Sequence, residues 1–372
     1  MNMKVLEYKL QFLSPAFLGN AEQSAQWRTP PIKALLRQWW RVAYAADRVF
    51  AVNLADMRRE EGLLFGNAWL EDNFGKSRVR LRLDRWDMGK LRKQDWQPLA
   101  SVAHPEVPRG VGSDLYLGYG LVTLPRGAHQ PTLKANAAIQ AGESATLSLA
   151  VPEADAPLIE HALWLMNRFG TLGGRSRNGW GSFALLPLPL VEASPERSRG
   201  GWGDGNLPLR SCQDCMELDW PHAIGADEQN QPLIWQTTQA FGDWKSVMQR
   251  LAQIKIGLRT QAQFEFGLDA VAGDQAHNQN IVHGRPQNRH WLSYPVTHHD
   301  VRAWKRENLR LPNTLRFKIR RTDKQQFVGV IFYVPHKPPA QFQPNAQTLQ
   351  QVWSQVHGFL NAPAQQLTRI PE

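Results

Sequence analysis

The sequence is poor in cysteine and has no long apolar run. Two cysteines stand among 372 residues, too few for the disulfide framework of a secreted protein. No stretch of 18 or more apolar residues occurs, and the N-terminal MNMKVLEYKL lacks the apolar core of a signal peptide. We therefore expect a cytoplasmic protein that has no contact with a membrane.

Motifs for nucleotides and metals are absent too. The pattern GxxxxGK[ST] does not occur, and the glycine-rich segment at 170–183 follows a predicted helix, whereas nucleotide fingerprints follow a strand. Cys212 and Cys215 form a single CxxC pair, and only His222 and His277 are at hand to complete the four ligands of a structural zinc. We expect no metal and no cofactor.

What the sequence does have is positive charge and tryptophan. Lys and Arg outnumber Asp and Glu by 43 to 33, which favours a polyanionic partner. Several of the 15 tryptophans adjoin a cation, as Trp40 adjoins Arg41 and Trp86 adjoins Arg85. Aromatic rings stack on bases while cations pair with phosphates. The other interpretation is that most of these rings belong to the core.

The segment 31–50 predicts a helix with a basic stripe. Apolar residues recur at helical spacing, while Lys33, Arg37 and Arg41 follow i, i+4, i+8 spacing with no Asp or Glu between residues 31 and 46. We predict that this stripe, with Arg28 before it and Trp40 as a stacking ring, contacts RNA. A solvated helix face is the alternative.

The order of predicted elements indicates an α+β fold. Strands are expected in the first half at 4–14, 77–85, 115–124, 145–151 and from 183 to 190, with a second helix at 155–169. In the strand at 77–85, Arg78, Arg80 and Arg82 alternate with aliphatic residues. Strand, helix, strands, helix, strand is the βαββαβ plan of a ferredoxin-like (RRM-like) module with insertions.

The second half predicts another such module. Helices are expected at 240–257 and 346–360, and paired strands at 315–319 and 326–334, the first with Arg316, Lys318 and Arg320 on one face. The stretch 269–290 is polar and predicts a mobile loop. The domain boundaries expected are 1–191, a linker at 192–209 rich in Gly, Pro and Ser, and 210–372.

The glycine-rich segment is the most specific candidate site. Its glycines permit positive φ angles, and such a loop can turn several N–H groups inward to hold an anion. Charge and hydrogen-bonding side chains are interleaved with them. The candidate RNA-binding residues here are Gly173, Gly174, Arg175, Ser176, Arg177, Asn178 and Gly179. A flexible turn between helix and strand is the alternative.

Together these segments resemble the RAMP superfamily of CRISPR-associated proteins, and most closely subunit one of the Cmr (type III-B) effector complexes. The segments that carry the resemblance are Leu13–Gly19, Pro31–Arg41, Leu64–Gly66, Leu172–Phe183 and Arg310–Lys318. The segment at 269–290 has no counterpart.

The resemblance implies two ferredoxin-like modules that form a cleft. It implies a subunit that holds guide RNA near its 3′ end, and target RNA, beside other subunits of the complex. Lys33, Trp40, Arg41 and 173–179 match the RNA-contacting positions of the family.

Two other functions remain open. A repeat-processing endoribonuclease needs a general base, usually histidine, yet the first histidine of the chain is His104. A metal-dependent slicing enzyme would use an aspartate near the RNA, and none of Asp84, Asp87 and Asp114 stands out. A scaffold would use its aromatic faces to bind other subunits. We predict a non-catalytic RNA-binding subunit, in which the cations of the first helix and of the glycine-rich segment converge on one RNA track.

Overall fold

The computed structural model describes residues 2–22, 24–69, 75–188, 206–266 and 281–371. Helices and strands alternate along the described chain, so the expected α+β class is confirmed. No helix in these ranges is both long and apolar enough to cross a bilayer.

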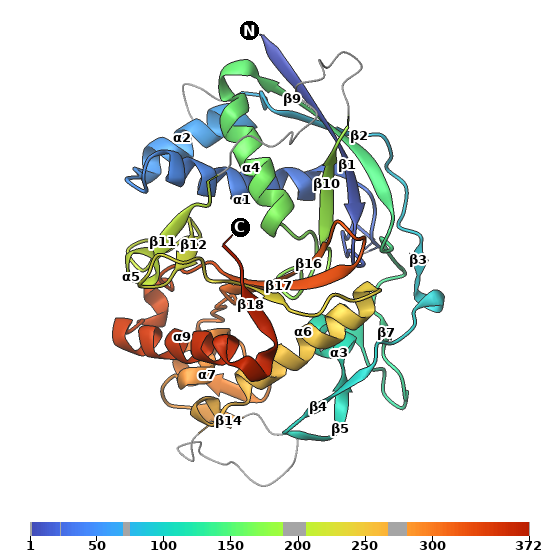
Figure 1. Ribbon diagram of the computed structural model, residues 1–372, viewed down its shortest axis with the longest axis vertical. Coiled ribbons are helices and arrows are strands. Elements are labelled where there is room, and N and C mark those ends of the chain that lie inside the picture. Colours follow the sequence, from blue (N-terminus) through green and yellow to red (C-terminus); the bar gives the residue numbers. More distant parts are fainter. Residues whose placement is uncertain (1, 23, 70–74, 189–205, 267–280, 372) are drawn as a thin grey trace.

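The first half is built on a four-stranded antiparallel sheet in the order β10-β1-β9-β2. Two helices cover one face of this sheet, where Leu10, Phe12 and Leu147 are buried (Figure 1). Its elements are β1 (Met3–Phe12), α1 (Thr29–Asp47), α2 (Leu54–Phe65), β2 (Arg80–Leu83), β9 (Ser144–Pro152), α4 (Ala156–Phe169) and β10 (Phe183–Pro187).

An insertion between β2 and β9 forms three small antiparallel pairs, β3-β8, β4-β5 and β6-β7. Its elements are β3 (Leu91–Arg92), β4 (Ser101–His104), β5 (Val107–Gly112), α3 (Ser113–Gly118), β6 (Val122–Thr123), β7 (Thr132–Leu133) and β8 (Ala137–Ala138). The strand predicted at 115–124 is wrong for residues 115–118, which belong to α3, and only Val122–Thr123 pair as the strand β6. Asp114 there accepts hydrogen bonds from the amides of Leu99 and Leu115, and the turn that follows packs Leu117 into the core as a helix.

The second half has its own four-stranded antiparallel sheet, in the order β16-β17-β13-β18. Two long helices lie against it, α6 and α9 (Figure 1). Its main elements are β13 (Ile234–Thr237), α6 (Trp244–Arg259), β16 (Leu315–Arg321), β17 (Phe327–Tyr333), α9 (Ala346–Asn361) and β18 (Leu367–Arg369). The shorter ones are β11 (Leu209–Ser211), α5 (Cys212–Cys215), β12 (Ile224–Ala226), β14 (Ile281–His283), α7 (Asn288–Leu292), β15 (His299–Val301) and α8 (Arg302–Arg306).

The two halves share a core. The sheet of the second half has α6 and α9 on one face and α1 and α4 of the first half on the other. At this junction the ring of Phe169 lies 5.8 Å from Trp39 and 5.0 Å from Phe332. Lys318 and Arg320 of β16 both donate to carbonyls at the end of α4, so the Arg316–Lys318–Arg320 face lies at the junction.

Two expected loops differ from the structure. Most of the predicted linker, residues 192–205, lies outside the described residues, and its end enters the parallel pair β11-β12. Residues 269–280 also lie outside them, but 281–290 form β14 and the start of α7. The predicted loop is wrong for residues 281–290, because His283 and His290 are buried against the ring of Phe266.

Candidate nucleic-acid interface

The cations of the basic stripe of α1 have partners inside the protein. Arg37 donates from Nε to Oε1 of Glu61 at 2.7 Å, and Arg41 donates to both oxygens of the same carboxylate at 2.8 and 2.9 Å. Glu61 belongs to α2 and is only 4% exposed. Lys33 donates to the carbonyl oxygen of Phe65 at 2.8 Å. These cations hold α2 against α1.

Trp40 is a core residue. It is 2% exposed, and its ring lies 4.9 Å from Tyr44 and 5.9 Å from Phe65. The prediction that it stacks on a base is wrong for this fold, because neither face of the ring is open. Arg28 lies directly before α1 and is half-buried, with Nε unpaired within the described chain.

The cations of α1 and of the glycine-rich loop do not form one track. A Cβ atom on Gly170 would lie 3.1 Å from Leu35, so the loop begins against that side of α1. Leu35 and Arg37 point about 160° apart around a helix axis. The predicted convergence is therefore wrong, and Lys33, Arg37, Trp40 and Arg41 leave the candidate site.

The glycine-rich loop itself is fixed by hydrogen bonds. Gly174 and Gly181 donate their amides to the carbonyls of Phe17 and Pro15 at 3.1 and 2.9 Å. Gly173 has φ +93°, and a Cβ there would lie 2.7 Å from the oxygen of Phe17. Gly179 has φ +92°, and its carbonyl accepts from Ser14 Oγ at 2.7 Å. The predicted need for glycine is confirmed at both positions, and the loop is no loose turn.

Within this frame the tip of the loop has free donors. The amides of Arg175, Ser176 and Arg177 make no hydrogen bond within the described chain, while the carbonyls of Arg175 and Ser176 accept from Asn178 and Gly179. Arg175 is exposed, with φ +52°. Successive N–H groups in such a turn form an anion-binding concavity.

Asn178 has an internal role. Its side chain is 9% exposed, donates to the carbonyl of Leu117 at 2.8 Å and accepts from Lys255 Nζ at 2.7 Å. Both polar atoms of the amide are used, so its predicted contact with RNA is wrong. The residue instead ties Lys255 of α6 to the loop.

Cations from the second half meet the loop, and the sequence interpretation missed their role. The amide of Phe317 on β16 donates to the carbonyl of Arg177 at 3.0 Å, which brings Arg316 beside the loop. Burial, and after it Arg177, lowers the pKa of Arg316 to about 9. Burial, followed by Arg259 and Arg175, lowers the pKa of Lys255 to about 7. The alternation at 315–320 was the available signal, but no pattern indicated Lys255.

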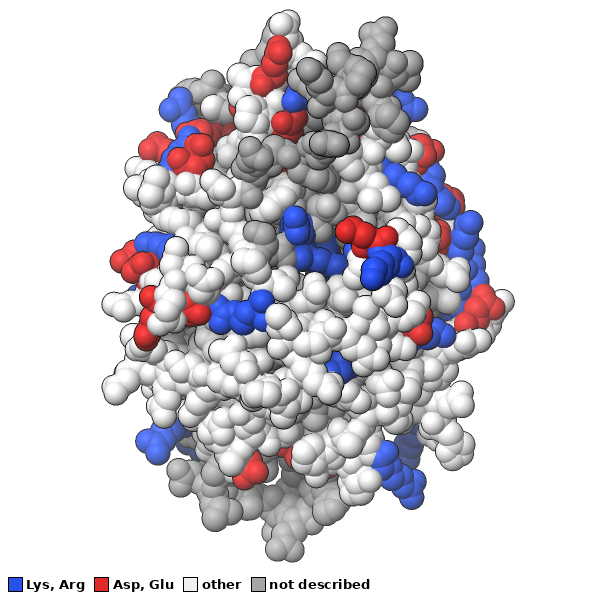
Figure 2. Space-filling model, in the orientation of Figure 1, with Lys and Arg blue, Asp and Glu red and all other residues white. Residues whose placement is uncertain are grey.

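Two other cations of β16 bind the C-terminal end of α4. Lys318 donates to the carbonyl of Gly170 and Arg320 to that of Arg168, where the helix dipole is negative. Figure 2 shows Lys and Arg side chains at the centre of one face, over the end of α4 and the strands β16 and β17 of Figure 1, with acidic side chains to one side.

The candidate metal ligands have other partners in the structure. Cys212 and Cys215 donate to carbonyl oxygens, and burial raises the pKa of Cys212 to about 12. His222 contacts Arg210 and the carbonyl of Trp220, and His277 lies outside the described residues. Within the described ranges no group of three His, Cys, Asp or Glu could hold a metal.

The three candidate aspartates also have internal partners. Asp84 accepts from the amide of Thr146, Asp87 is paired with Arg85, and Asp114 is buried with backbone amides as donors.

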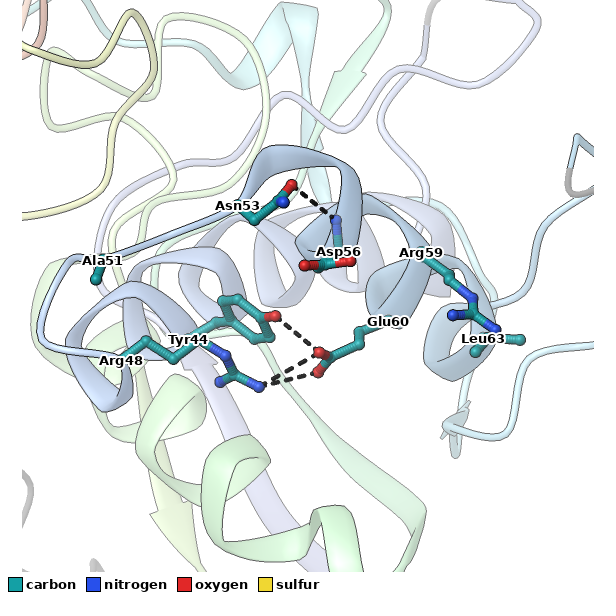
Figure 3. Close-up of a pocket in the computed structure, with 8 residues that line it drawn as sticks. All are labelled: Tyr44, Arg48, Ala51, Asn53, Asp56, Arg59, Glu60 and Leu63. Carbon is teal, nitrogen blue, oxygen red and sulfur yellow. Dashed lines mark hydrogen bonds and ion pairs between the residues drawn. The ribbon is translucent and has the colours of Figure 1, made fainter.

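A hollow of about 430 Å³ lies between the end of α1 and α2 (Figure 3). Glu60 accepts there from Tyr44 at 2.9 Å and from Arg48 at 3.1 Å, and the Arg48 guanidinium lies 3.5 Å from the centre of the Tyr44 ring. These groups satisfy one another, and none of the predicted site residues lines the hollow.

Residues 9–184 match the family model of the RAMP superfamily. Across this range the chain belongs to the RAMP superfamily. The RAMP region runs from β1 to β10 and includes the glycine-rich loop, whereas Lys255 and Arg316 lie beyond it.

Solved structures are similar to this chain over half to nearly all of its length. Cmr1 from Pyrococcus furiosus is 14% identical, with 98% of each chain covered and a TM-score of 0.47. A chain of the type III-B Cmr-beta complex bound to cognate target RNA and AMPPnP is 11% identical, with 95% of this chain and 99% of that chain covered and a TM-score of 0.47. A chain of a type IV-B CRISPR complex is 10% identical, with 53% and 100% covered and a TM-score of 0.29. No curated protein matches the sequence.

Proposed function

We propose that this protein is a non-catalytic RNA-binding subunit of a type III-B CRISPR ribonucleoprotein, acting in antiviral defence in the cytoplasm. It holds guide RNA, target RNA or both where its two halves meet. The observation that carries this proposal is the set of cations around the glycine-rich loop. Arg175, Arg177, Lys255 and Arg316 come from both halves, and none has a carboxylate partner within the described chain.

A buried cation such as Arg316 is unfavourable when nothing compensates its charge. Desolvating a charge costs free energy unless an opposite charge or hydrogen bonds replace water. Elsewhere the protein supplies such partners, as Glu61 does for Arg37 and Arg41. At the loop it supplies free amides and more cations, which suits a phosphate backbone.

The strand orders support two ferredoxin-like modules, at 1–191 and 210–372. In each half the first strand lies between the third and fourth, and the second is at the edge next to the third, all antiparallel. That is the order the βαββαβ plan requires when its two helices cover one face. The loop joins the second helix to the fourth strand of the first module.

The lowered pKa of His336, the histidine near the glycine-rich loop, supports a non-catalytic role. Burial lowers the pKa of His336 to about 4, and Arg316 and Arg177 contribute to this lowering. A general base works best with a pKa near the working pH. We therefore expect labelled single-stranded RNA to remain intact when incubated with the protein, and cleavage would favour the endoribonuclease alternative.

The binding proposal is tested by fluorescence anisotropy with labelled single-stranded RNA. Arg175→Glu should weaken binding at least about tenfold and reduce the salt slope by about 0.7 for each phosphate that the protein no longer neutralises. Arg302→Glu, a charge reversal at an exposed arginine of α8, is the matched control and should change affinity far less. Equal effects of the two reversals would mean that only net charge matters. If Arg175→Glu leaves RNA binding intact and prevents assembly with other subunits, the protein is a scaffold.

A further inference from the structure

One arginine at the junction of the halves has an unusual environment. Arg316 is 8% exposed, and its Nε is buried without a partner. Its guanidinium makes no hydrogen bond or ion pair with any described residue. Its neighbours on the same strand face, Lys318 and Arg320, both donate to carbonyls at the end of α4. Arg316 differs from both, because the described residues offer its guanidinium no acceptor.

A second unpaired guanidinium comes from the first half. Arg177 is half-buried, and its carbonyl accepts from the amide of Phe317, the residue after Arg316. Its side chain has no polar partner within the described ranges. Burial lowers the pKa of Arg177, and Arg177 in turn lowers that of Arg316, so the two cations repel each other.

An imidazole also lies near the two arginines. His336 follows β17 and is half-buried, with Nδ1 3.2 Å from the carbonyl of Val334. Burial lowers the pKa of His336 to about 4, and Arg316 and Arg177 lower it further, so the ring is neutral at pH 7. A neutral ring that donates from Nδ1 to this carbonyl has an unprotonated Nε2, which cannot donate to a phosphate oxygen. None of the carboxylates in the described chain is paired with any of the three groups.

Two forked donors brought together by the bond between Phe317 and Arg177 suit a tetrahedral oxyanion. Guanidinium groups bind phosphate oxygens through two parallel hydrogen bonds, and the interaction is stronger in a poorly hydrated place. We propose that Arg177 and Arg316 hold one phosphate group at the junction of the two halves. RNA as the source of this phosphate rests on the proposed function; the preference for phosphate does not.

The proposal predicts opposite effects on stability and on binding. Arg316→Met removes an uncompensated buried charge while keeping most of the apolar volume. We expect the free variant to melt at or above the temperature of the unmodified protein, while its affinity for single-stranded RNA falls at least about tenfold. Arg316→Lys keeps the charge and loses the fork, so it should also weaken RNA binding, and it serves if the Met variant does not fold. Arg302→Met is the matched control and should change neither measurement.

Melting in inorganic phosphate, compared with chloride of equal ionic strength, tests the two-arginine site without RNA. Phosphate should stabilise the unmodified protein and Arg302→Met, but not Arg316→Met. If that result is found and RNA does not bind, the two-arginine site is correct and the proposed function is wrong. If RNA binds all variants equally and phosphate stabilises them equally, the two-arginine site is wrong and the proposed function stands. If saturating phosphate stabilises the protein and single-stranded RNA does not displace it, the site holds free phosphate, and RNA as its source is overturned.

Discussion

Arg37 and Arg316 are both arginines on regular elements, and their surroundings are opposite. Arg37 faces a buried carboxylate across a helix pair, whereas Arg316 faces another arginine across the junction of the halves. Sequence spacing placed each on a definite face of its element. The partner on the facing element decides whether the cation is part of the internal structure or available to a ligand.

Glu61→Gln tests the internal role of the α1 cations. Its carboxylate is buried, but the side chains of Arg37 and Arg41 are 37% and 42% exposed, so solvent weakens each pair. We expect a loss of about 2 kcal/mol in the free energy of unfolding, below the usual range for a fully buried pair. Urea denaturation measures it, with Glu60→Gln, which removes a more exposed carboxylate, as the milder control. RNA affinity should change less than about threefold, and a larger change would return α1 to the site.

Lys255 should make RNA binding depend on pH. Burial lowers its pKa to about 7, so the free protein loses this proton as the pH rises above 7. A nearby phosphate would raise the pKa, so binding takes up a proton and affinity falls between pH 7 and about 9. Anisotropy at pH 6.5 and 8.5 measures this, and Lys255→Gln should flatten the profile. A profile unchanged in Lys255→Gln would contradict the assignment.

The lowered pKa of Lys255 affects stability and RNA affinity in opposite directions as the pH rises. The pKa of Lys255 is lower in the folded protein than the usual 10.5, so the unfolded chain binds more protons between pH 7 and 10.5. The contribution of Lys255 to the free energy of unfolding therefore rises with pH in that window.

At the scale of elements, the glycine-rich loop depends on contacts with the segment after β1. Gly173 and Gly174 approach the backbone of Phe17, and Gly181 donates to Pro15. The motif predicted positive φ angles. It did not indicate that the carbonyls of this earlier segment hold the loop so that its amides at 175–177 have no hydrogen-bond partner among the described residues.

Gly173→Ala should damage this loop. The new Cβ would meet the Phe17 oxygen at 2.7 Å in a backbone conformation of φ +93°. We expect a loss of about 2 to 3 kcal/mol in stability together with weaker RNA binding. Gly127→Ala is the matched control, because its φ is +81° and nothing lies within 4 Å of the Cβ position. It should cost about 1 kcal/mol, and an equal loss in both variants would show that only the φ angle matters.

At the scale of the whole molecule, the two halves are joined by a continuous core. Phe332 of β17 is 1% exposed and packs on Phe169 of α4. Cations from both halves meet at the glycine-rich loop on the same junction. The candidate site therefore exists only when the halves are docked.

Phe332→Ala should destabilise both halves together. Truncation of a buried phenylalanine costs about 3 to 5 kcal/mol, and the shared core should keep the urea transition single. Hydrogen exchange followed in α1 and in α9 should show the same loss of protection. Val5→Ala, at a position that is 50% exposed, is the control and should cost less than about 0.5 kcal/mol. Loss of protection in α9 alone would show that the halves unfold independently.

The sequence by itself determined the long elements, because their periodicity is local. The helices at α1, α4, α6 and α9 and the pair β16-β17 lie within a few residues of their predicted positions. It also determined the glycine-rich loop, since φ angles near +90° at Gly173 and Gly179 are a property of single residues.

Only the tertiary structure decided which cations form the candidate site. Glu61 lies 20 or more positions from the two arginines it pairs with, and Arg177 meets Arg316 across 139 positions of the chain. Trp40 and Asn178 looked available in the sequence, and packing buried both. Burial and charge pairing depend on what faces a side chain across the fold, and no local pattern records that.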